Sequence, residues 1–201
     1  MLSATDLSCV RGGRPLFSGV GLRIGAGEWL HVRGANGAGK TSLLRILAGL
    51  SAPAAGQISW NDVPLARAGE DYRRAMVYLG HAPAIKDDLT ASENLAFMQA
   101  QDEVTLSEAE RLAILVRVGL RHRLQVPVRH LSAGQRRRVS LARLLLRRAP
   151  LWILDEPFTA LDVDAVAWLG GVVAEHVRAG GCAVLTSHQD IPLPAGRTLQ
   201  L

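Results

Sequence analysis

The amino-acid sequence predicts an α/β fold in which a sheet of buried parallel strands is interrupted by a helical insertion. Three observations lead to this prediction. Short apolar runs typical of buried strands recur along the chain. One such run near residue 30 is followed by a glycine-rich loop and then by helical apolar spacing. From about residue 85 to 147 the apolar spacing is helical, which indicates a segment inserted into the α/β frame.

The composition is that of a globular protein with a substantial core. The chain has 201 residues, of which 48% are hydrophobic, so it can form one domain or two small ones. No window approaches the roughly 18 uncharged apolar residues that a membrane-spanning helix needs. Residues 1–10 include Asp6 and lack the basic segment that opens a signal peptide. From these two features we expect a cytoplasmic protein. Cys9 and Cys182 have neither metal nor redox spacing, which suits a reducing compartment.

Two short strands are expected at the N-terminus, over residues 2–7 and 19–24. The turn-forming residues 12–15 separate them, and residues 25–28 form a second turn. The apolar run at residues 29–32 is suited to a buried strand. The chain therefore begins with a small strand-rich segment that leads into the glycine-rich loop.

Residues 34–41 read Gly-Ala-Asn-Gly-Ala-Gly-Lys-Thr and match the phosphate-loop pattern G-x-x-x-x-G-K-[ST] at every fixed position. The glycines let backbone N–H groups point at phosphate oxygens, while Lys40 can reach the β and γ phosphates and Thr41 can ligate Mg²⁺. A helix expected over residues 42–48 adds the partial positive charge of its N-terminus. The alternative, a flexible glycine turn with a chance lysine, does not explain the strand before the loop and the helix after it. The residues expected to bind the nucleotide phosphates are Gly34, Ala35, Asn36, Gly37, Ala38, Gly39, Lys40, Thr41 and Ser42.

The chain after this helix continues the α/β pattern. Gly49 ends the helix, residues 51–56 form a loop, and residues 57–61 form a strand. A further apolar strand over residues 76–79 leads into residues 80–83, which read Gly-His-Ala-Pro.

The helical segment begins at residues 90–93, whose sequence Thr-Ala-Ser-Glu is a capping box. Helical apolar spacing then recurs at residues 95–98, 109–118 and 139–146. Residues 131–135 read Leu-Ser-Ala-Gly-Gln and lie directly before an arginine-rich helix. The Ser132 hydroxyl and the backbone N–H of Gly134 form a second candidate phosphate site at the start of that helix.

From Arg111 to Arg148 the chain has eleven arginines and no Asp, Glu or Lys. Such a block favours an anionic partner: a nucleotide, an acidic membrane leaflet, an acidic protein face or nucleic acid. A solvated basic face is an equal alternative, and some of these arginines are expected to pair with acids elsewhere in the fold. Nucleic acid is the least favoured partner, because the block contains no Phe, Tyr or Trp on which bases could stack.

Residues 151–154, Leu-Trp-Ile-Leu, form an apolar strand that delivers Asp155 and Glu156 at its carboxyl end, where ligands bind in open parallel sheets. Asp155 can hold Mg²⁺, and Glu156 can polarise a water towards the γ phosphate. Adjacent acids are common on protein surfaces, but a pair that follows a phosphate loop by about a hundred residues is expected to be functional.

Another buried-type strand, over residues 183–187, ends at His188. The His188 imidazole can contact the γ phosphate, and the alternative is a structural histidine with satisfied hydrogen bonds. Residues 198–201 are expected to form the last strand.

Together these motifs resemble those of an ATP-binding cassette (ABC) ATPase, the nucleotide-binding subunit of ABC transporters, over essentially the whole chain. They occur in the order of that family: the phosphate loop at 34–41, the signature at 131–135, the acid-tipped strand at 151–156, the turn at 159–162 and the switch histidine His188. The resemblance implies a P-loop NTPase fold, the ABC cassette, with a RecA-like core, an N-terminal antiparallel β subdomain and an inserted helical subdomain. It implies one ABC domain over residues 1–201, with the core at about 1–84 and 148–201 and the helical subdomain at about 85–147.

The resemblance also implies a mechanism that needs two cassettes. ATP at the phosphate loop of one copy is closed over by Ser132 and Gly134 of the other, and Asp162 lines the shared interface. Because this chain carries one copy of each motif, the simplest second cassette is another copy of itself. The catalytic residues implied are Lys40, Glu156 and His188.

Two positions depart from the family pattern. Arg11 stands where the family has an aromatic residue that stacks on adenine, and a guanidinium plane can also stack on a base. His81 stands where the family has Gln, which touches Mg²⁺ and the attacking water; imidazole can still bind either. The expected metal ligands are therefore Thr41, Asp155 and His81. We hypothesise that turnover falls as His81 becomes protonated, and an unchanged acid limb in His81→Gln would contradict this.

Further stretches narrow the resemblance to the cassette subunit of the bacterial cytochrome c maturation system, a haem exporter. They are residues 7–9, 41–50, 78–86, 89–95 and 156–162. The similarity implies a homodimer docked on an integral membrane subunit at the cytoplasmic face of the inner membrane. It implies ATP and Mg²⁺ as cofactors, haem export or handling as the driven step, and no nucleic-acid partner. The chain has no C-x-x-C-H and no evident haem site of its own.

Two alternatives stay open: the ATPase of another small ABC transporter, and a soluble cofactor-assembly ATPase. Membrane co-fractionation with a polytopic partner would separate the second from a transporter. A nucleic-acid-processing cassette is less favoured, because the chain has neither a long coiled-coil insertion nor a second cassette. A regulator without hydrolysis is disfavoured because Lys40, Asp155, Glu156 and His188 are all present. The motifs do not encode the cargo or the direction of transport.

Overall fold

The computed structural model describes residues 1–188, 191, 193–194 and 196–201. The chain forms two units, which are described in turn. The first unit comprises Met1–Tyr78, Ala149–Pro157 and Gly170–Leu201. The second unit comprises Leu79–Arg148 and Phe158–Leu169.

An antiparallel sheet with the strand order β2-β1-β4-β5 opens the first unit. Its strands are β1 Leu2–Arg11, β2 Arg14–Ile24, β4 Ala55–Trp60 and β5 Val63–Pro64. β1 and β2 are longer than the sequence predicted, because the turn between them contains only Gly12 and Gly13. Both glycines have a positive φ, 55° and 74°, which suits a two-residue hairpin turn. The prediction that the turn extends through Arg14 and Pro15 was therefore wrong.

A second sheet, with the strand order β6-β7-β8-β3-β9, forms the centre of the α/β fold. Its strands are β3 Trp29–Arg33, β6 Met76–Leu79, β7 Leu151–Leu154, β8 Cys182–Thr186 and β9 Arg197–Gln200. β8 pairs in parallel with β3 and β7, and β3 pairs in parallel with β9. Every residue of β7 and β8 is buried, as expected of parallel strands covered on both faces. The sequence predicted β6 and β7 with these bounds and placed the ends of the other three within one residue.

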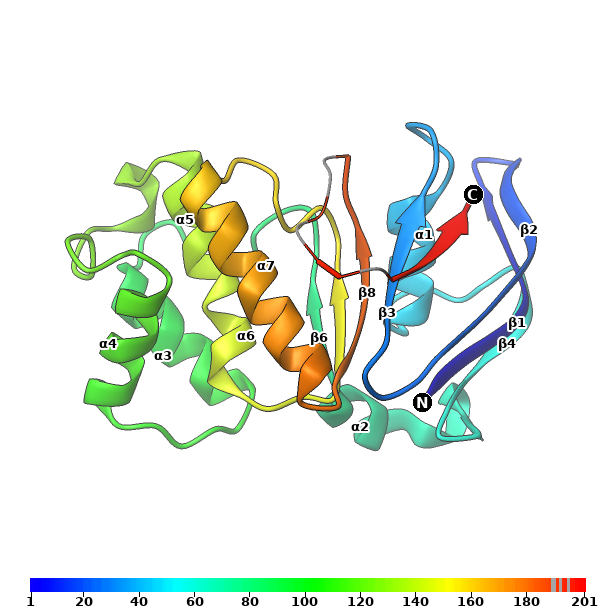
Figure 1. Cartoon of the computed structure of the whole chain (residues 1–201), viewed down its shortest axis with the longest axis horizontal. Coiled ribbons are helices and arrows are strands. Elements are labelled where there is room, and N and C mark those ends of the chain that lie inside the picture. Colours follow the sequence, from blue (N-terminus) through cyan, green and yellow to red (C-terminus); the bar gives the residue numbers. More distant parts are fainter. Residues whose placement is uncertain (189–190, 192, 195) are drawn as a thin grey trace. The chain divides into compact units, whose positions relative to one another are not determined.

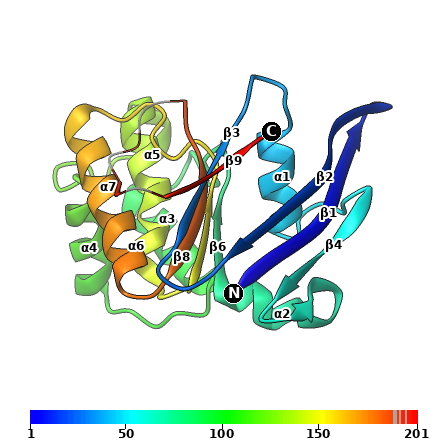
Figure 2. The ribbon, with the colours of Figure 1, turned by 45° about the vertical axis from the view of Figure 1, so that its right-hand side comes forward.

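Helix α1, Lys40–Leu47, lies between the two sheets of the first unit (Figures 1 and 2). Leu43 and Leu44 of this helix belong to the same buried core as Leu7 of β1 and Val184 of β8. Burial of each such side chain contributes about 1.5–3 kcal/mol. The core therefore fixes α1, and with it the phosphate loop that precedes the helix.

The sequence analysis missed two helices. α2, Leu65–Ala75, has eleven residues, of which five are charged, and is kinked at Gly69, where φ is 33°. Its only large hydrophobic side chains are Leu65 and Tyr72, so it contains no long apolar run. α7, Val163–Arg178, begins in the second unit and ends in the first. The pair Gly170 and Gly171 interrupts its pattern and lowers its helix propensity. Across the stretches that the structure describes, no helix is both long and apolar enough to span a membrane.

The second unit is helical and has its own hydrophobic core. Its helices are α3 Ala91–Gln101, α4 Glu108–Arg117, the 3₁₀ turn η1 Val128–His130, α5 Ala133–Leu141 and α6 Arg143–Leu146. Leu95, Leu115 and Val139 lie in the core with no exposed surface. These residues come from three helices, so the core joins α3, α4 and α5.

Capping boxes set the starts of α3, α4 and α5, through Thr90, Ser107 and Ser132. The box at Thr90 was predicted and is confirmed. The single helix predicted at residues 139–146 is instead two helices, α5 and α6. α5 begins earlier than its apolar spacing indicates because the Ser132 cap, and not the apolar pattern, determines where the helix starts.

Candidate nucleotide site

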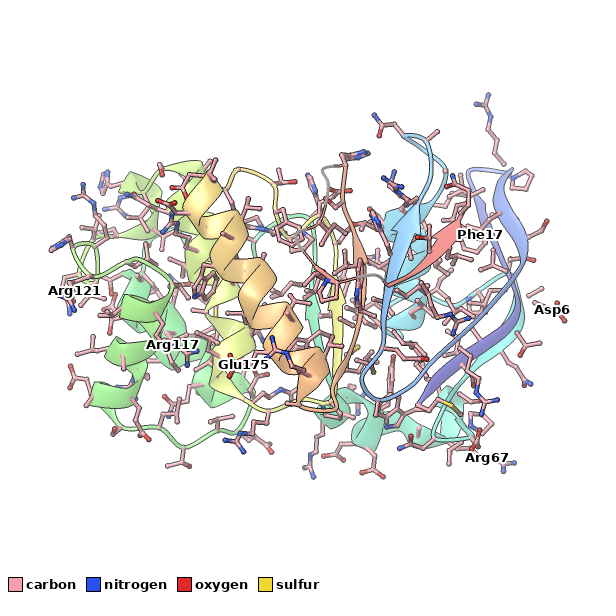
Figure 3. The ribbon with its side chains drawn as sticks, viewed as in Figure 1. Asp6, Phe17, Arg67, Arg117, Arg121 and Glu175 are labelled. Atoms are coloured by element: carbon pink, nitrogen blue, oxygen red, sulfur yellow. The ribbon has the colours of Figure 1, made fainter. Side chains whose placement is uncertain are left out.

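The phosphate loop connects β3 to α1 in the first unit. Gly39 precedes α1 with a φ of 99°, and a Cβ there would lie 3.0 Å from Cδ1 of Phe17 and 3.1 Å from Cβ of Leu16. A Cβ at Gly34 would lie 3.1 Å from the backbone oxygen of Leu201. Any larger residue at either glycine therefore forces a shift in its neighbours, which include Phe17 of β2 (Figure 3).

The Lys40 ammonium is bound to the backbone of the phosphate loop. Its Nζ donates hydrogen bonds to the backbone oxygens of Gly34 at 2.8 Å and Ala35 at 3.1 Å. The first turn of α1 contains no acidic residue, so nothing there offsets the partial positive charge of the helix N-terminus. Thr41 is exposed, whereas Ser42 is buried. The loop, the ammonium and the helix N-terminus together favour the binding of phosphate.

Thr186, the last residue of β8, holds the two acids that follow β7. Its Oγ1 donates to Oδ1 of Asp155 at 2.9 Å and accepts the backbone N–H of Glu156 at 2.8 Å. Asp155 and Thr186 are 1% and 0% exposed. Glu156 has a positive φ of 49°, an uncommon conformation for a non-glycine residue that clusters at functional sites. The sequence analysis missed Thr186, whose signal is a hydroxyl at the end of an otherwise apolar strand.

His188 lies beside Glu156 in the first unit. Its Nε2 is 3.5 Å from Oε1 of Glu156, and its backbone N–H donates to Oε2 at 3.2 Å. The side-chain contact is an ion pair only when the imidazole is protonated. The structure therefore brings Asp155, Glu156 and His188 together at the carboxyl ends of β7 and β8.

His31 of β3 is a buried histidine to which the sequence analysis gave no role. Its Nε2 lies 3.3 Å from the backbone oxygen of Ser187, the residue before His188. Burial lowers the pKa of His31 below its ordinary value of 6.5, and the hydrogen bond to Ser187 acts in the opposite direction. At pH 7 the imidazole is therefore neutral, and it can donate to Ser187 and support the segment that carries His188.

In the second unit, Ser132 stands at the N-terminus of α5, as the sequence predicted. Its Oγ accepts the backbone N–H of Gln135 at 3.2 Å, and Oε1 of Gln135 accepts the backbone N–H of Ser132 at 3.1 Å. Because the Ser132 oxygen acts as an acceptor in this cap, its hydroxyl proton can still be donated to a phosphate oxygen. A Cβ at Gly134 would lie 2.7 Å from the backbone oxygen of Ala160, so this approach requires glycine.

Asp162 lies in the same unit and is held by α5 and α7. Nη2 of Arg138 is 2.7 Å from both carboxylate oxygens of Asp162. Oδ1 of Asp162 also accepts the backbone N–H of Ala165 at 2.9 Å. The hydrogen bond from Ala165, followed by the charge of Arg138, holds the pKa of Asp162 below its ordinary value. Asp162 is therefore a carboxylate that joins the start of α7 to α5.

The predicted site residues are divided between the two units. The first unit contains Arg11, the phosphate loop, Asp155, Glu156 and His188, and the second contains His81, Ser132, Gly134 and Asp162. Arg11 is exposed at the end of β1, next to the glycine turn. His81 is exposed in the loop that follows β6.

Two of the three expected metal ligands, Thr41 and Asp155, lie in the first unit. No three side chains of His, Cys, Asp or Glu gather into a metal site within the described residues. Mg²⁺ does not need such a cluster, because it binds through one or two carboxylates, retained waters and substrate phosphates. A hydroxyl and a carboxylate are oxygen ligands of the kind that Mg²⁺ prefers, so this donor set fits the ion.

Several arginines of the block at residues 111–148 pair with acids, as the sequence analysis expected. The ion pairs are Arg129 with Asp88, Arg138 with Asp162 and Arg143 with Asp102. Other members remain exposed, and the Arg121 side chain extends away from the ribbon in Figure 3. Part of the block therefore stabilises the helical unit, and the exposed part leaves both an anionic partner and a solvated basic face as alternatives.

Residues 17–159 match the family described as ABC transporter. The chain is 49% identical over 201 residues to "Cytochrome c biogenesis ATP-binding export protein CcmA" of Dechloromonas aromatica, covering 100% of this chain and 98% of that protein. It is 51% identical over 200 residues to a protein of the same name from Aromatoleum aromaticum, covering 99% and 94%. A solved structure of an ATP-binding subunit of an ABC transporter is 31% identical and has a TM-score of 0.83, covering 94% of this chain and 79% of that one.

Proposed function

Since the chain belongs to the ABC transporter family, we propose that it is the ATP-hydrolysing subunit of a membrane ABC complex that drives an export step in c-type cytochrome biogenesis. The observation that carries the hydrolytic part is the way Thr186 holds Asp155 and Glu156, with His188 beside Glu156. The biogenesis part is supported by two relatives of about half identity, both named as cytochrome c biogenesis export proteins. The proposed cargo is haem.

ATP binds at the loop between β3 and α1. The backbone N–H groups of the loop and the Lys40 ammonium bind the β and γ phosphates. Thr41 and Asp155 would hold Mg²⁺, which would supply positive charge to the phosphate oxygens. Thr186 keeps Asp155 in place through a 2.9 Å hydrogen bond.

Hydrolysis depends on Glu156 and His188. Glu156 polarises the attacking water. The hydrogen bond from its backbone N–H to Thr186 holds the main chain of Glu156 and so helps to position its carboxylate. His188, which follows the carboxyl end of β8, binds the γ phosphate. Because both residues sit on one unit with the phosphate loop, hydrolysis can be coordinated with nucleotide binding.

The complete site requires a second copy of the chain. Ser132 and Gly134 of one copy close over the ATP that is bound by the other, and Asp162 lines the shared interface. The N-terminus of α5 supports this role, because it is capped by an exposed serine hydroxyl that can donate to phosphate. Each chain contributes one ABC domain to the homodimer. The homodimer docks on an integral membrane subunit at the cytoplasmic face of the inner membrane.

Two proposed contacts use residues that depart from the family pattern. Arg11 stacks its guanidinium plane on the adenine ring, for which its exposed position at the end of β1 leaves room. His81, in its exposed loop after β6, would take the place of the family's glutamine towards the bound Mg²⁺ and the attacking water.

Deletion of this gene in the source cell, followed by covalent haem staining of membrane c-type cytochromes, tests the proposal. We expect staining to disappear, to return with the wild-type gene, and to stay absent with Lys40→Ala or Glu156→Gln. Normal staining in the deletion strain would refute the role in cytochrome biogenesis. ATP hydrolysis by the purified protein, lost in Glu156→Gln, tests the enzymatic part separately.

A further inference from the structure

Arg137, in the middle of α5, is a buried cation that contacts the loop after β6. It is 4% exposed, although arginine is rarely buried to this degree. Its Nη1 donates to the backbone oxygen of Gly80 at 3.1 Å and to that of His81 at 3.4 Å. These carbonyls lie 57 and 56 residues away along the chain. The guanidinium therefore joins α5 to the loop that carries His81.

The chemistry of this contact suits arginine better than lysine. Burial of a charged group is costly unless hydrogen bonds replace the lost water. The two N–H groups of Nη1 can donate to both carbonyls, and a guanidinium is more weakly hydrated than the compact ammonium of lysine, so it loses less on burial. Because Arg137 binds backbone carbonyls, it fixes the main chain of residues 80–81 directly and their side chains only indirectly.

The neighbouring arginines of α5 hold other segments of the same unit. Arg136 donates to the backbone oxygens of Leu131 and Arg129, and Arg138 binds Asp162. Successive residues of a helix point about 100° apart, so three consecutive arginines can reach three different segments. The middle one, Arg137, contacts the His81 loop.

We propose that Arg137 is a positioning residue that locks the backbone of Gly80 and His81 to α5. The N-terminus of the same helix carries Ser132, so the lock makes the His81 loop follow α5 when that end engages a nucleotide. The inference rests on the proposed function, in which His81 contacts the nucleotide site of its own chain and Ser132 contacts the ATP of the second copy. Arg137 acts on the nucleotide site through the backbone of this loop.

A double-mutant cycle on the purified full chain tests this coupling. Arg137→Gln is expected to lower kcat for ATP hydrolysis about tenfold and to leave KM for ATP within about twofold, because the phosphate loop is untouched. In a His81→Ala background the same change should lower kcat less than about twofold, since the group being positioned is gone. Arg137→Lys should recover only part of the loss. Arg136→Gln is the matched control. Its effect on kcat should be independent of His81→Ala, so that the double variant shows the product of the two single fold-changes in kcat.

Amide hydrogen exchange gives a readout that does not depend on activity. In Arg137→Gln, we expect the amides of residues 80–82 to exchange at least about tenfold faster, while α1 and β7 keep their protection. Wild-type exchange at residues 80–82, or kcat effects of Arg137→Gln and His81→Ala that multiply, would overturn the proposal. Loss of protection in α1 and β7 as well would also overturn it, because the role would then be general stability. Absence of ATP hydrolysis by the wild type would instead refute the proposed function, and the exchange experiment would still decide the role of Arg137.

Discussion

Replacing Thr186 with Val removes one hydroxyl from the candidate site and keeps the shape of the side chain. The hydroxyl makes two hydrogen bonds, to Oδ1 of Asp155 and from the backbone N–H of Glu156. A typical hydrogen bond contributes about 0.5–1.5 kcal/mol and one to a charged group about 1.5–3 kcal/mol, so losing these two predicts a loss of about 2–4.5 kcal/mol of unfolding free energy. This is a large part of the roughly 5–15 kcal/mol that stabilises a typical domain.

Urea unfolding of the purified protein measures this loss. Thr186→Ser is the matched control, because it keeps the hydroxyl and removes only a methyl group, at a cost of about 1 kcal/mol. ATP turnover gives a second measurement. We expect kcat to fall in Thr186→Val, because the backbone of Glu156 is no longer held, and to stay near the wild-type value in Thr186→Ser.

Equal unfolding free energies and equal kcat values for the two variants would refute the reasoning. That result would mean that the hydroxyl of Thr186 does not hold the acids and that their positions come from β7 alone. A loss of stability without a loss of turnover would limit the role of Thr186 to the fold.

Arg143→Met leaves the carboxylate of Asp102 buried without its cation, and urea unfolding should show a loss of about 3 kcal/mol, whereas an unchanged midpoint would contradict the pairing. Gly39→Ala adds a Cβ at a φ of 99° against β2, so ATP binding measured by calorimetry should weaken at least about tenfold; wild-type affinity would contradict the tight contact. Burial lowers the pKa of His176, which stacks on Trp152 at 3.8 Å between ring centroids. As the pH falls, the His176 imidazole is therefore protonated in the unfolded chain before it is protonated in the folded one, and the unfolding free energy decreases below about pH 6.5. His176→Phe should reduce the difference in unfolding free energy between pH 7.5 and 5.5, and an unchanged difference would argue against this.

The parts of the fold that the sequence predicted are those with a local physical cause. β6 and β7 are continuous apolar runs, and Thr90 with Glu93 is a capping box that can be recognised from four residues. The hairpin was only partly predicted, because the sequence does not show that the turn closes within two glycines. α2 was missed because five of its eleven residues are charged, and α7 because Gly170 and Gly171 interrupt its apolar pattern.

The candidate site divides in the same way. The phosphate loop and the acid pair could be predicted, since their chemistry depends on residues that are adjacent in the chain. Thr186 and Arg137 could not, because their roles depend on contacts across 31 and 57 residues. A threonine at a strand end and one arginine among three give no local sign of their partners.

The hydrogen bonds of Lys40 to Gly34 and Ala35 have a consequence for nucleotide affinity. A free lysine side chain loses about 2 kcal/mol of rotamer entropy when it is ordered. Here the side chain is already ordered by its own loop, so an arriving phosphate meets a preset ammonium. The phosphate must, however, compete with two carbonyl oxygens for the same protons. When a phosphate binds, the Lys40 ammonium exchanges hydrogen bonds to the protein's own carbonyl oxygens for hydrogen bonds to phosphate oxygens. The affinity of the loop for nucleotide therefore depends on the difference between these two sets of hydrogen bonds.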